Sequence, residues 1–294
     1  MTGQEPTPLR RFAAEFAASR VALAGLALLA LILLAALLAP LIAPQNPYDL
    51  AQLDLVDSRL PPGSRSSAGG VYWLGTDAQG RDMLSAILYG LRISVSVGFA
   101  STACGLAIGV TLGLLAGYSG GWLDALIMRL ADLQLSFPSI LIALVLLAVL
   151  GQGLDKIVVA LIAVQWAYYA RTARAGALVE RRKEYIEAAA CLAFSPARIV
   201  FRHLLPNCLP PLVVVAAVQA AAAIALEATL SFLGLGLPIT EPSLGLLISN
   251  GFTYMLSGKY WISFFPGLAL LALIVGINLV ADRLRDVLNP RLRN

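Results

Sequence analysis

Two groups of residues have types that could carry out phosphate or metal chemistry, but their spacing supports neither. A phosphate-binding loop needs glycines that lead into Lys and then Ser or Thr, whereas the only Gly-Lys pair, Gly258 and Lys259, is followed by Tyr260. One histidine, His203, and three dispersed cysteines match no recognised spacing for a four-ligand zinc site. We therefore expect no ATP, magnesium or other metal site in this chain.

One serine has the surroundings of a nucleophile. Residues 117–120 read Gly-Tyr-Ser-Gly, which matches the setting of the nucleophile in rhomboid intramembrane proteases, and His203 could act as the base. Rhomboids place that histidine inside a spanning helix, whereas His203 stands among Arg198, Arg202 and Pro206. A glycine-rich turn between two helices is the simpler interpretation of so short a match. A reactive serine at position 119 would favour a rhomboid-like protease.

Glu227 is the ionisable residue that stands most alone in an apolar stretch, residues 222–233. Ionisable groups at membrane depth are costly and are often functional, so Glu227 makes a proton-coupled secondary transporter an alternative. A hydrogen bond between helices inside the bundle, or a contact with another subunit, is the simpler explanation. Asp124, Arg129 and Asp132 recur at helical spacing, which favours a local ion pair over a proton relay.

The composition indicates what kind of structure positions these residues. Hydrophobic residues make up 59% of the 294 positions and charged residues only 13%, so the chain cannot fold as a soluble globule with a solvated surface. A helix needs roughly 20 mostly apolar residues to cross a bilayer, and several runs of about that length are present. We therefore expect an all-α, multi-pass membrane protein. The basic residues lie beside apolar runs, so the net charge of +4 fits membrane orientation rather than nucleic-acid binding.

Six apolar runs predict six membrane-spanning helices. The first run is too long for a cleaved signal peptide, so we expect an uncleaved helix with its N-terminus inside. The predicted spans cover residues 21–42, 93–117, 123–150, 157–170, 209–235 and 264–279. The fourth is short, so it must extend toward Gln152 or let Arg171 reach the interface. Residues 45–90 are punctuated by Pro and Gly and are expected to form an external loop.

The basic residues predict the orientation of the bundle. Six spans with an internal N-terminus place both termini and residues 118–122 and 171–208 in the cytoplasm, and the inner side then holds 15 of the 21 Lys and Arg residues. The charge distribution therefore supports six spans with both termini inside. Cys104, Cys191 and Cys208 lie in an apolar run or near the internal basic loop, where thiols stay reduced, so no disulfide is expected.

The internal loop at residues 187–207 carries more pattern than a connector requires. Its Ala-rich start predicts a helix that begins at Glu187, with the carboxylate near the positive end of the helix dipole. Ser195 and Pro196 are typical of the N-cap and first position of a second short helix, which should end before Pro206. Small residues at positions 188, 189, 190 and 193 leave a low face that another protein could approach closely.

This loop resembles the E-A-A … L-P signature of the permeases of binding-protein-dependent ABC importers. The matching residues are Glu187, Ala188, Ala189, Leu205 and Pro206. Two positions depart from the signature: Ala193 stands where the family usually has Gly, and His203 where the general signature has Ile. The peptide branch commonly has His there, in an Arg-His-x-Leu-Pro-Asn ending that residues 202–207 match.

Four further stretches are similar to the C-type permease subunits of dipeptide, oligopeptide and nickel ABC importers. They are residues 74–94 before the second span, residues 227–236, the Pro-Ser-Leu-Gly at 242–245, and the tail that contains residues 282–286 and 289–291. The likeness runs from about residue 10 to the end of the chain. Because that subtype usually has Glu at the position of Glu227, this residue no longer argues for proton coupling.

The resemblance implies the fold of a type I ABC importer permease, in which residues 1–90 comprise the N-terminal tail, first span and external loop. Residues 91–294 are then the five-helix core. It also implies a second homologous permease, two cytoplasmic ATPase subunits that bind ATP and magnesium, an external solute-binding protein and the lipid bilayer as partners, with no catalysis in this chain. The location that it implies is the bacterial cytoplasmic (inner) membrane. Short peptides are the expected substrate, with nickel or another small solute as alternatives.

The resemblance also points to the residues that join the chain to an ATPase. The expected coupling residues are Glu187, Ala188, Ala189, Ala193, Ser195, Arg198, Arg202, His203 and Pro206. Glu227 is a possible polar site inside the membrane.

Overall fold

The structure is a computed structural model that describes residues 7–49, 53–67, 69–238 and 240–288. The chain is almost entirely helical, as expected from its composition. The elements in chain order are α1 (Pro8–Ala17), α2 (Arg20–Leu37), α3 (Ala39–Ile42), η2 (Leu55–Asp57), β1 (Ser64–Arg65), β2 (Val71–Tyr72), α4 (Met83–Ser119), α5 (Gly121–Leu135), α6 (Ser139–Leu150), α7 (Leu154–Glu180), α8 (Glu184–Cys191), α9 (Pro196–Ile199), the π-helical turn η3 (Val200–Leu204), α10 (Leu205–Phe232), α11 (Leu244–Phe252), η4 (Met255–Ser257) and α12 (Trp261–Leu288). The tail motif at residues 289–291 lies outside the described residues.

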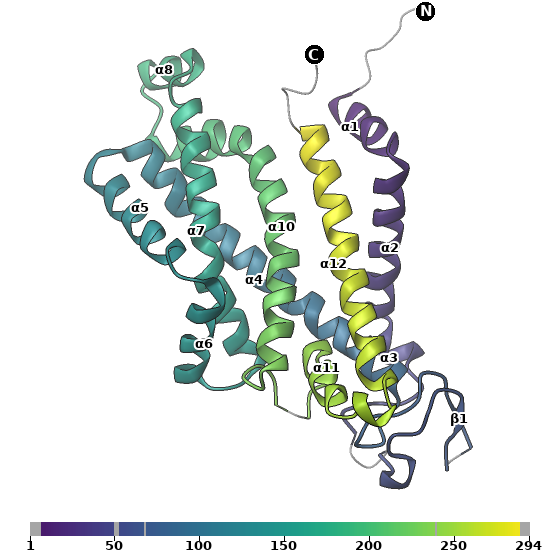
Figure 1. Cartoon of the computed structure of the whole chain (residues 1–294). Coiled ribbons are helices and arrows are strands. Elements are labelled where there is room, and N and C mark those ends of the chain that lie inside the picture. Colours follow the sequence, from purple (N-terminus) through teal and green to yellow (C-terminus); the bar gives the residue numbers. More distant parts are fainter. Residues whose placement is uncertain (1–6, 50–52, 68, 239, 289–294) are drawn as a thin grey trace, which may run out of the picture.

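The long helices run between two ends of the molecule, which carry different connecting segments. Figure 1 shows α8, α1 and the end of α12 at the top, and strand β1, α3 and α11 at the bottom. The predicted internal loop therefore lies at the same end as the first and last helical residues. The predicted external loop lies at the opposite end, which is the arrangement that an even number of spans requires.

The long helices correspond to the six predicted spans, although not all of them are equally apolar. Within the described residues, four helical segments are long and apolar enough to cross a membrane: residues 20–37, 83–119, 196–232 and 261–288. The bent pair α5 and α6 makes five if it counts as one span. The predicted fourth span corresponds to α7, whose 27 residues would reach about 40 Å at the rise of an α-helix.

Two predicted boundaries move because of local capping. The second helix starts at Met83 rather than at residue 93, since the Asp82 side chain accepts a hydrogen bond from the Ser85 amide and caps the helix there. The predicted external loop therefore ends at residue 82. The expected boundary between residues 90 and 91 falls inside α4, so no break in the fold marks it. The division of the chain into two parts at this point stays a prediction.

The third span is not the single helix that the sequence predicts. It breaks between α5 and α6, which meet at an angle of 92°. Pro138 explains the break, because proline lacks an amide hydrogen and disfavours helical conformation in the residue before it. The two halves lie on the same side of the molecule as α7 (Figure 1).

The fourth span extends beyond its apolar run at both ends. It begins at Leu154 and continues past Arg171 to Glu180. Arg174 makes a two-pronged ion pair with Asp124 at 2.5 and 2.7 Å, and Arg171 pairs with Asp132 at 2.5 Å. The prediction of an ion pair within the third span was therefore wrong, since both carboxylates pair with arginines of α7.

α4 and α7 approach each other along a row of glycines. Gly105, Gly109, Gly113 and Gly117 are spaced four residues apart and face α7. A Cβ atom added at Gly109 would overlap the carbonyl oxygen of Trp166, and one added at Gly113 would overlap the carbonyl oxygen of Ala170. Small residues let membrane helices approach closely enough for backbone contact, so these glycines determine how close the helices pack.

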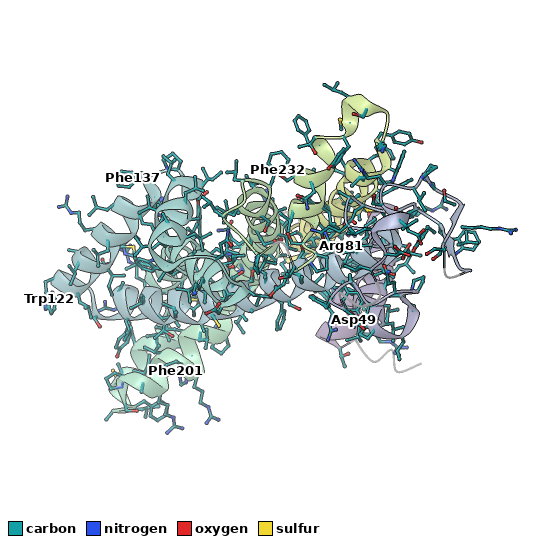
Figure 2. The ribbon with its side chains drawn as sticks, turned by 90° about the horizontal axis from the view of Figure 1, so that it is seen from below. Asp49, Arg81, Trp122, Phe137, Phe201 and Phe232 are labelled. Carbon is teal, nitrogen blue, oxygen red and sulfur yellow. The ribbon has the colours of Figure 1, made fainter. Side chains whose placement is uncertain are left out.

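The external segment before α4 folds around buried polar contacts. Asp57 is 4% exposed and accepts hydrogen bonds from Tyr72, Ser66 and Ser67. Burial alone would raise the pKa of Asp57, but these hydrogen bonds together hold it below its usual value. Arg81, which is labelled in Figure 2, pairs with Asp77 at 2.7 Å.

Candidate functional site in the loop between α7 and α10

The first helix of the loop begins earlier than the sequence predicts. α8 starts at Glu184, so Glu187 lies in its first turn rather than at its start. Both carboxylates still lie near the positive end of the helix dipole, as expected. The loop is held where it leaves α7, since Glu180 accepts hydrogen bonds from Lys183 and Tyr185, each at 2.6 Å.

The three consecutive alanines of α8 divide between two faces. Ala189 is only 4% exposed and packs with Ile186 and Cys208 in a cluster that also includes residues of α4 and α10. Ala188 and Ala190 are exposed. A partner can therefore approach Ala188 directly, whereas Ala189 holds α8 against the bundle. Glu187 is exposed, and within the described residues its carboxylate makes neither a hydrogen bond nor an ion pair.

Ala193 adopts the backbone conformation that glycine normally supplies. Its φ angle is +55°, and it follows Leu192, the C-cap residue of α8. The Phe194 amide donates to the Ala189 carbonyl and the Ala193 amide donates to the Ala190 carbonyl, the two hydrogen bonds of a Schellman helix ending. The bend therefore forms without the glycine of the family signature. An L-residue in this conformation costs about 1–2 kcal/mol.

We expect Ala193→Gly to stabilise the end of α8 by about 1 kcal/mol, because glycine adopts a positive φ without steric cost. Amide hydrogen exchange at residues 193 and 194 should slow roughly fivefold. Ala190→Gly is the matched control, since Ala190 lies inside the same helix and is also exposed. That change should destabilise α8 by about 1 kcal/mol. Faster exchange in Ala193→Gly would contradict the assignment.

The second short helix starts as predicted. The Ser195 hydroxyl accepts a hydrogen bond from the Arg198 amide at 3.4 Å, and Pro196 occupies the first helical position. The Arg198 guanidinium lies 4.1 Å from the centre of the Phe194 ring, and the His203 ring lies 5.9 Å from it. Phe194, which the sequence analysis did not select, therefore contacts both α9 and η3. Its signal was an aromatic residue directly after Ala193, the position where the family usually has Gly.

α9 ends at Ile199, before Pro206 as predicted, but the chain stays helical beyond it. After α9 the chain continues through the π-helical turn η3, and α10 starts at Leu205 with Pro206 in its first turn. Proline is tolerated there because the amide hydrogen it lacks belongs to a helix start. Wide turns of this kind are frequent at functional sites. Arg202 and Pro206 are exposed, and Phe201 lies on the part of the chain that projects from the bundle (Figure 2).

Glu227 lies where the simpler explanation placed it. It is fully buried and accepts hydrogen bonds from Ser94 of α4 and Ser231 of α10, each at 2.9 Å. These contacts connect two helices inside the bundle. The hypothesis of a hydrogen bond between helices is confirmed.

Ser119 and His203, the possible nucleophile and base, belong to different elements. Ser119 is the last residue of α4, followed by Gly120 with a φ angle of +67°. His203 lies in η3, with its Nδ1 atom 3.3 Å from the Arg198 carbonyl oxygen. Within the described residues no hydrogen bond joins Ser119 to His203. The glycine-rich stretch is thus the junction between two helices: residues 117–119 end α4, and Gly121 begins α5.

Comparison with known proteins agrees with the fold and with the motifs of the loop. Residues 109–294 match the family of binding-protein-dependent transport system inner membrane components, and residues 7–62 match the N-terminal membrane domain of oligopeptide transport permease C. A chain of the MetNI methionine ABC transporter in an inward-facing conformation has a similar fold, with a TM-score of 0.57 and 23% identity. The match covers 70% of this chain and 98% of that one.

Several relatives match along nearly the whole chain. The di/tripeptide transport system permease protein DppC of Pseudomonas aeruginosa is 38% identical, over 98% of this chain and 94% of that protein. The dipeptide transport system permease protein DppC of Haemophilus influenzae is also 38% identical, over 100% and 98%. The glutathione transport system permease protein GsiD of Pectobacterium atrosepticum is 36% identical, over 98% and 93%. This chain belongs to the family of binding-protein-dependent transport system inner membrane components.

Proposed function

We propose that this chain is one of two permease subunits of an ABC importer for short peptides. The observation that carries the proposal is the projecting loop, in which Glu187 and Ala188 are exposed on a helix that Ala189 anchors to the bundle. In the proposed assembly a second homologous permease completes the pathway, and an external binding protein delivers the substrate. Two cytoplasmic ATPases bind ATP and magnesium, so hydrolysis resides in partner subunits.

The position of the loop supports a mechanical connection between ATP hydrolysis and the bundle. Residues 196–232 form one helical segment from α9 through η3 into α10. A displacement of α8 and α9 by an ATPase would therefore be transmitted directly to α10. Rigid-body movement of packed helices is the usual structural means of alternating between two open states. The proposed coupling residues are those of the sequence analysis, with Ala189 acting as an anchor rather than as a contact.

The names of the relatives support short peptides as the substrate, since two are permeases for dipeptides or for di- and tripeptides.

The orientation in the membrane is part of the same proposal: α8, the start of α1 and the end of α12 face the cytoplasm, and the region around Asp57 faces outward. This orientation places most of the basic residues on the inner side.

The proposal predicts a division of labour that reconstitution can measure. The isolated chain should show no ATP binding at millimolar nucleotide, whereas proteoliposomes that contain all subunits and the binding protein should take up radiolabelled dialanine when ATP is supplied. ATP binding by the isolated chain would contradict the division. Uptake of nickel or another small solute in place of dialanine would keep the transport role and change the substrate.

A further inference from the structure

The groove along α10 continues from the cytoplasmic end to the middle of the bundle. An open cavity of about 930 Å³ lies between α7, α10 and α12, and a small cavity of about 70 Å³ lies deeper, between α6, α7 and α10. Both are lined by Tyr168 and Gln219, so the two cavities meet at these side chains. The larger cavity falls within the size range of sites for small molecules.

One face of α10 lines this groove along most of its length. Its lining residues follow each other at intervals of three or four, as shown by Asn207, Pro211, Val214, Val218, Ala222 and Leu226. This spacing keeps the residues on one side of a helix. The groove is therefore a continuous feature of a single helix face.

Two polar groups that line this groove lack partners within the described residues. The Gln219 amide and the Tyr168 hydroxyl make no hydrogen bond there, although both lie within long helices that cross the bundle. Other polar side chains nearby are satisfied: Gln165, for example, accepts a hydrogen bond from Tyr169. An unpaired amide facing lipid is costly, so such a group faces water, a ligand or another protein.

We propose that this groove is the chain's half of the translocation pathway, and that Gln219 and Tyr168 form a contact point for the peptide backbone where the groove narrows. This inference rests on the proposed function for its substrate. An amide and a phenol together donate and accept hydrogen bonds without charge, which suits peptide bonds whatever the side chains. Asp282 and Arg285 line the wide end, where they present one charge of each sign to a zwitterionic peptide.

The groove assignment is tested by thiol labelling, independently of the substrate. In the full complex, with Cys104→Ala, Cys191→Ala and Cys208→Ala as background, inside-out vesicles are exposed to a positively charged methanethiosulfonate reagent. Val218→Cys lies in the groove, and Val213→Cys is the control on the same helix outside it; Val218 and Val213 are 45% and 43% exposed. Because the reagent needs water and a thiolate, Val218→Cys should react at least about tenfold faster.

Two results of the labelling would overturn the assignment. Equal rates at the two positions would mean that the groove holds no more water than the lipid-facing side. An unreactive Val218→Cys that instead cross-links to the second permease would mean that this face of α10 is a subunit interface.

The role of Gln219 is tested by the number of dialanine molecules taken up per ATP hydrolysed. Gln219→Leu keeps the size of the side chain and removes the amide, so this ratio should fall about tenfold, whereas Val213→Leu should leave it unchanged. Gln219→Asn, which keeps an amide, should recover at least half of the loss. An unchanged ratio in Gln219→Leu would overturn the role of this residue.

Failure of the two hypotheses can be told apart. If the wild-type complex does not transport dialanine but Val218→Cys is labelled, the substrate class is wrong and the groove assignment is supported. If dialanine is transported and Val218→Cys is not labelled, the groove assignment is wrong and the substrate class is supported.

Discussion

Gly113→Leu should prevent α4 and α7 from packing, and with it the accumulation of folded protein. The Cβ atom alone would overlap the carbonyl oxygen of Ala170, and the Ala173 Cβ atom would lie 2.8 Å away. These are backbone and short side-chain atoms, which cannot rotate away as a long side chain would. We expect a loss of about 3 kcal/mol, the upper end of the usual cost of overpacking a core.

The position of the substitution makes the effect large. Gly109 and Gly117, one turn away on either side, are in similarly close contact with α7: a Cβ atom on Gly117 would lie 2.7 Å from that of Ala177. A displacement at Gly113 therefore separates the helices over several turns. The interhelical ion pair between Asp124 and Arg174 depends on the same arrangement, because α5 follows α4 directly.

A matched pair of alanine substitutions separates helix packing from helix propensity. Gly113→Ala and Gly267→Ala each place one methyl group on a helical glycine, but a Cβ atom at Gly267 would meet no atom within 4 Å. Gly267→Ala should therefore be neutral or stabilising by up to about 1 kcal/mol, whereas Gly113→Ala should lower the thermal midpoint of the chain in detergent. Equal midpoints for the two variants would contradict the packing argument.

The same glycines show what sequence reasoning can and cannot reach. Four glycines at intervals of four residues are a readable signal for close helix packing, and the last of them, Gly117, also belongs to the Gly-Tyr-Ser-Gly stretch. The partner helix could not be inferred in that way. Only the folded structure shows that the glycines pack against α7, at residues such as Ala170 and Ala173.

Apolar runs predicted the number and order of the long helices, because the length needed to cross a bilayer leaves few choices. They did not predict where the helices end. Asp82 sets one boundary by capping a helix, and Pro138 sets another by disfavouring helical conformation in the residue before it. The mean hydropathy of a run of residues does not contain either effect. The extension of α7 to Glu180 depends on ion pairs with another helix, a tertiary effect.

In the candidate site, the sequence predicted roles that depend on neighbouring residues in the chain. It did not predict roles that depend on contacts between helices. Ser195 and Pro196 were placed correctly because an N-cap and a first helical position are set within four residues. Which alanine of α8 faces the bundle depends on where α8 lies against α4 and α10. The inward position of Ala189 therefore became visible only with the fold.

Ala188→Trp and Glu187→Lys should abolish uptake while the chain still inserts and pairs with its second permease. Both residues are exposed on α8, and neither side chain contributes to the cluster that holds the helix, so the fold itself should tolerate the changes. A protein that docks against this face would meet a large ring at position 188 or an inverted charge at position 187. Overpacking costs about 1–3 kcal/mol, and breaking one side of a desolvated charge pair costs about 2–5 kcal/mol.

A loss of about 3 kcal/mol in docking corresponds to more than a hundredfold weaker binding of the ATPase, since each 1.4 kcal/mol is a factor of ten. Uptake of dialanine and ATP hydrolysis stimulated by the binding protein should therefore fall together. Ala197→Trp and Glu184→Lys introduce the same changes at exposed positions of the same loop outside the signature, and each should keep at least half of wild-type uptake. If both controls fail equally, the loss reflects bulk or charge anywhere on the loop. If the Glu187 and Ala188 variants transport normally at normal abundance, the ATPase docks elsewhere and the assignment of this loop is wrong.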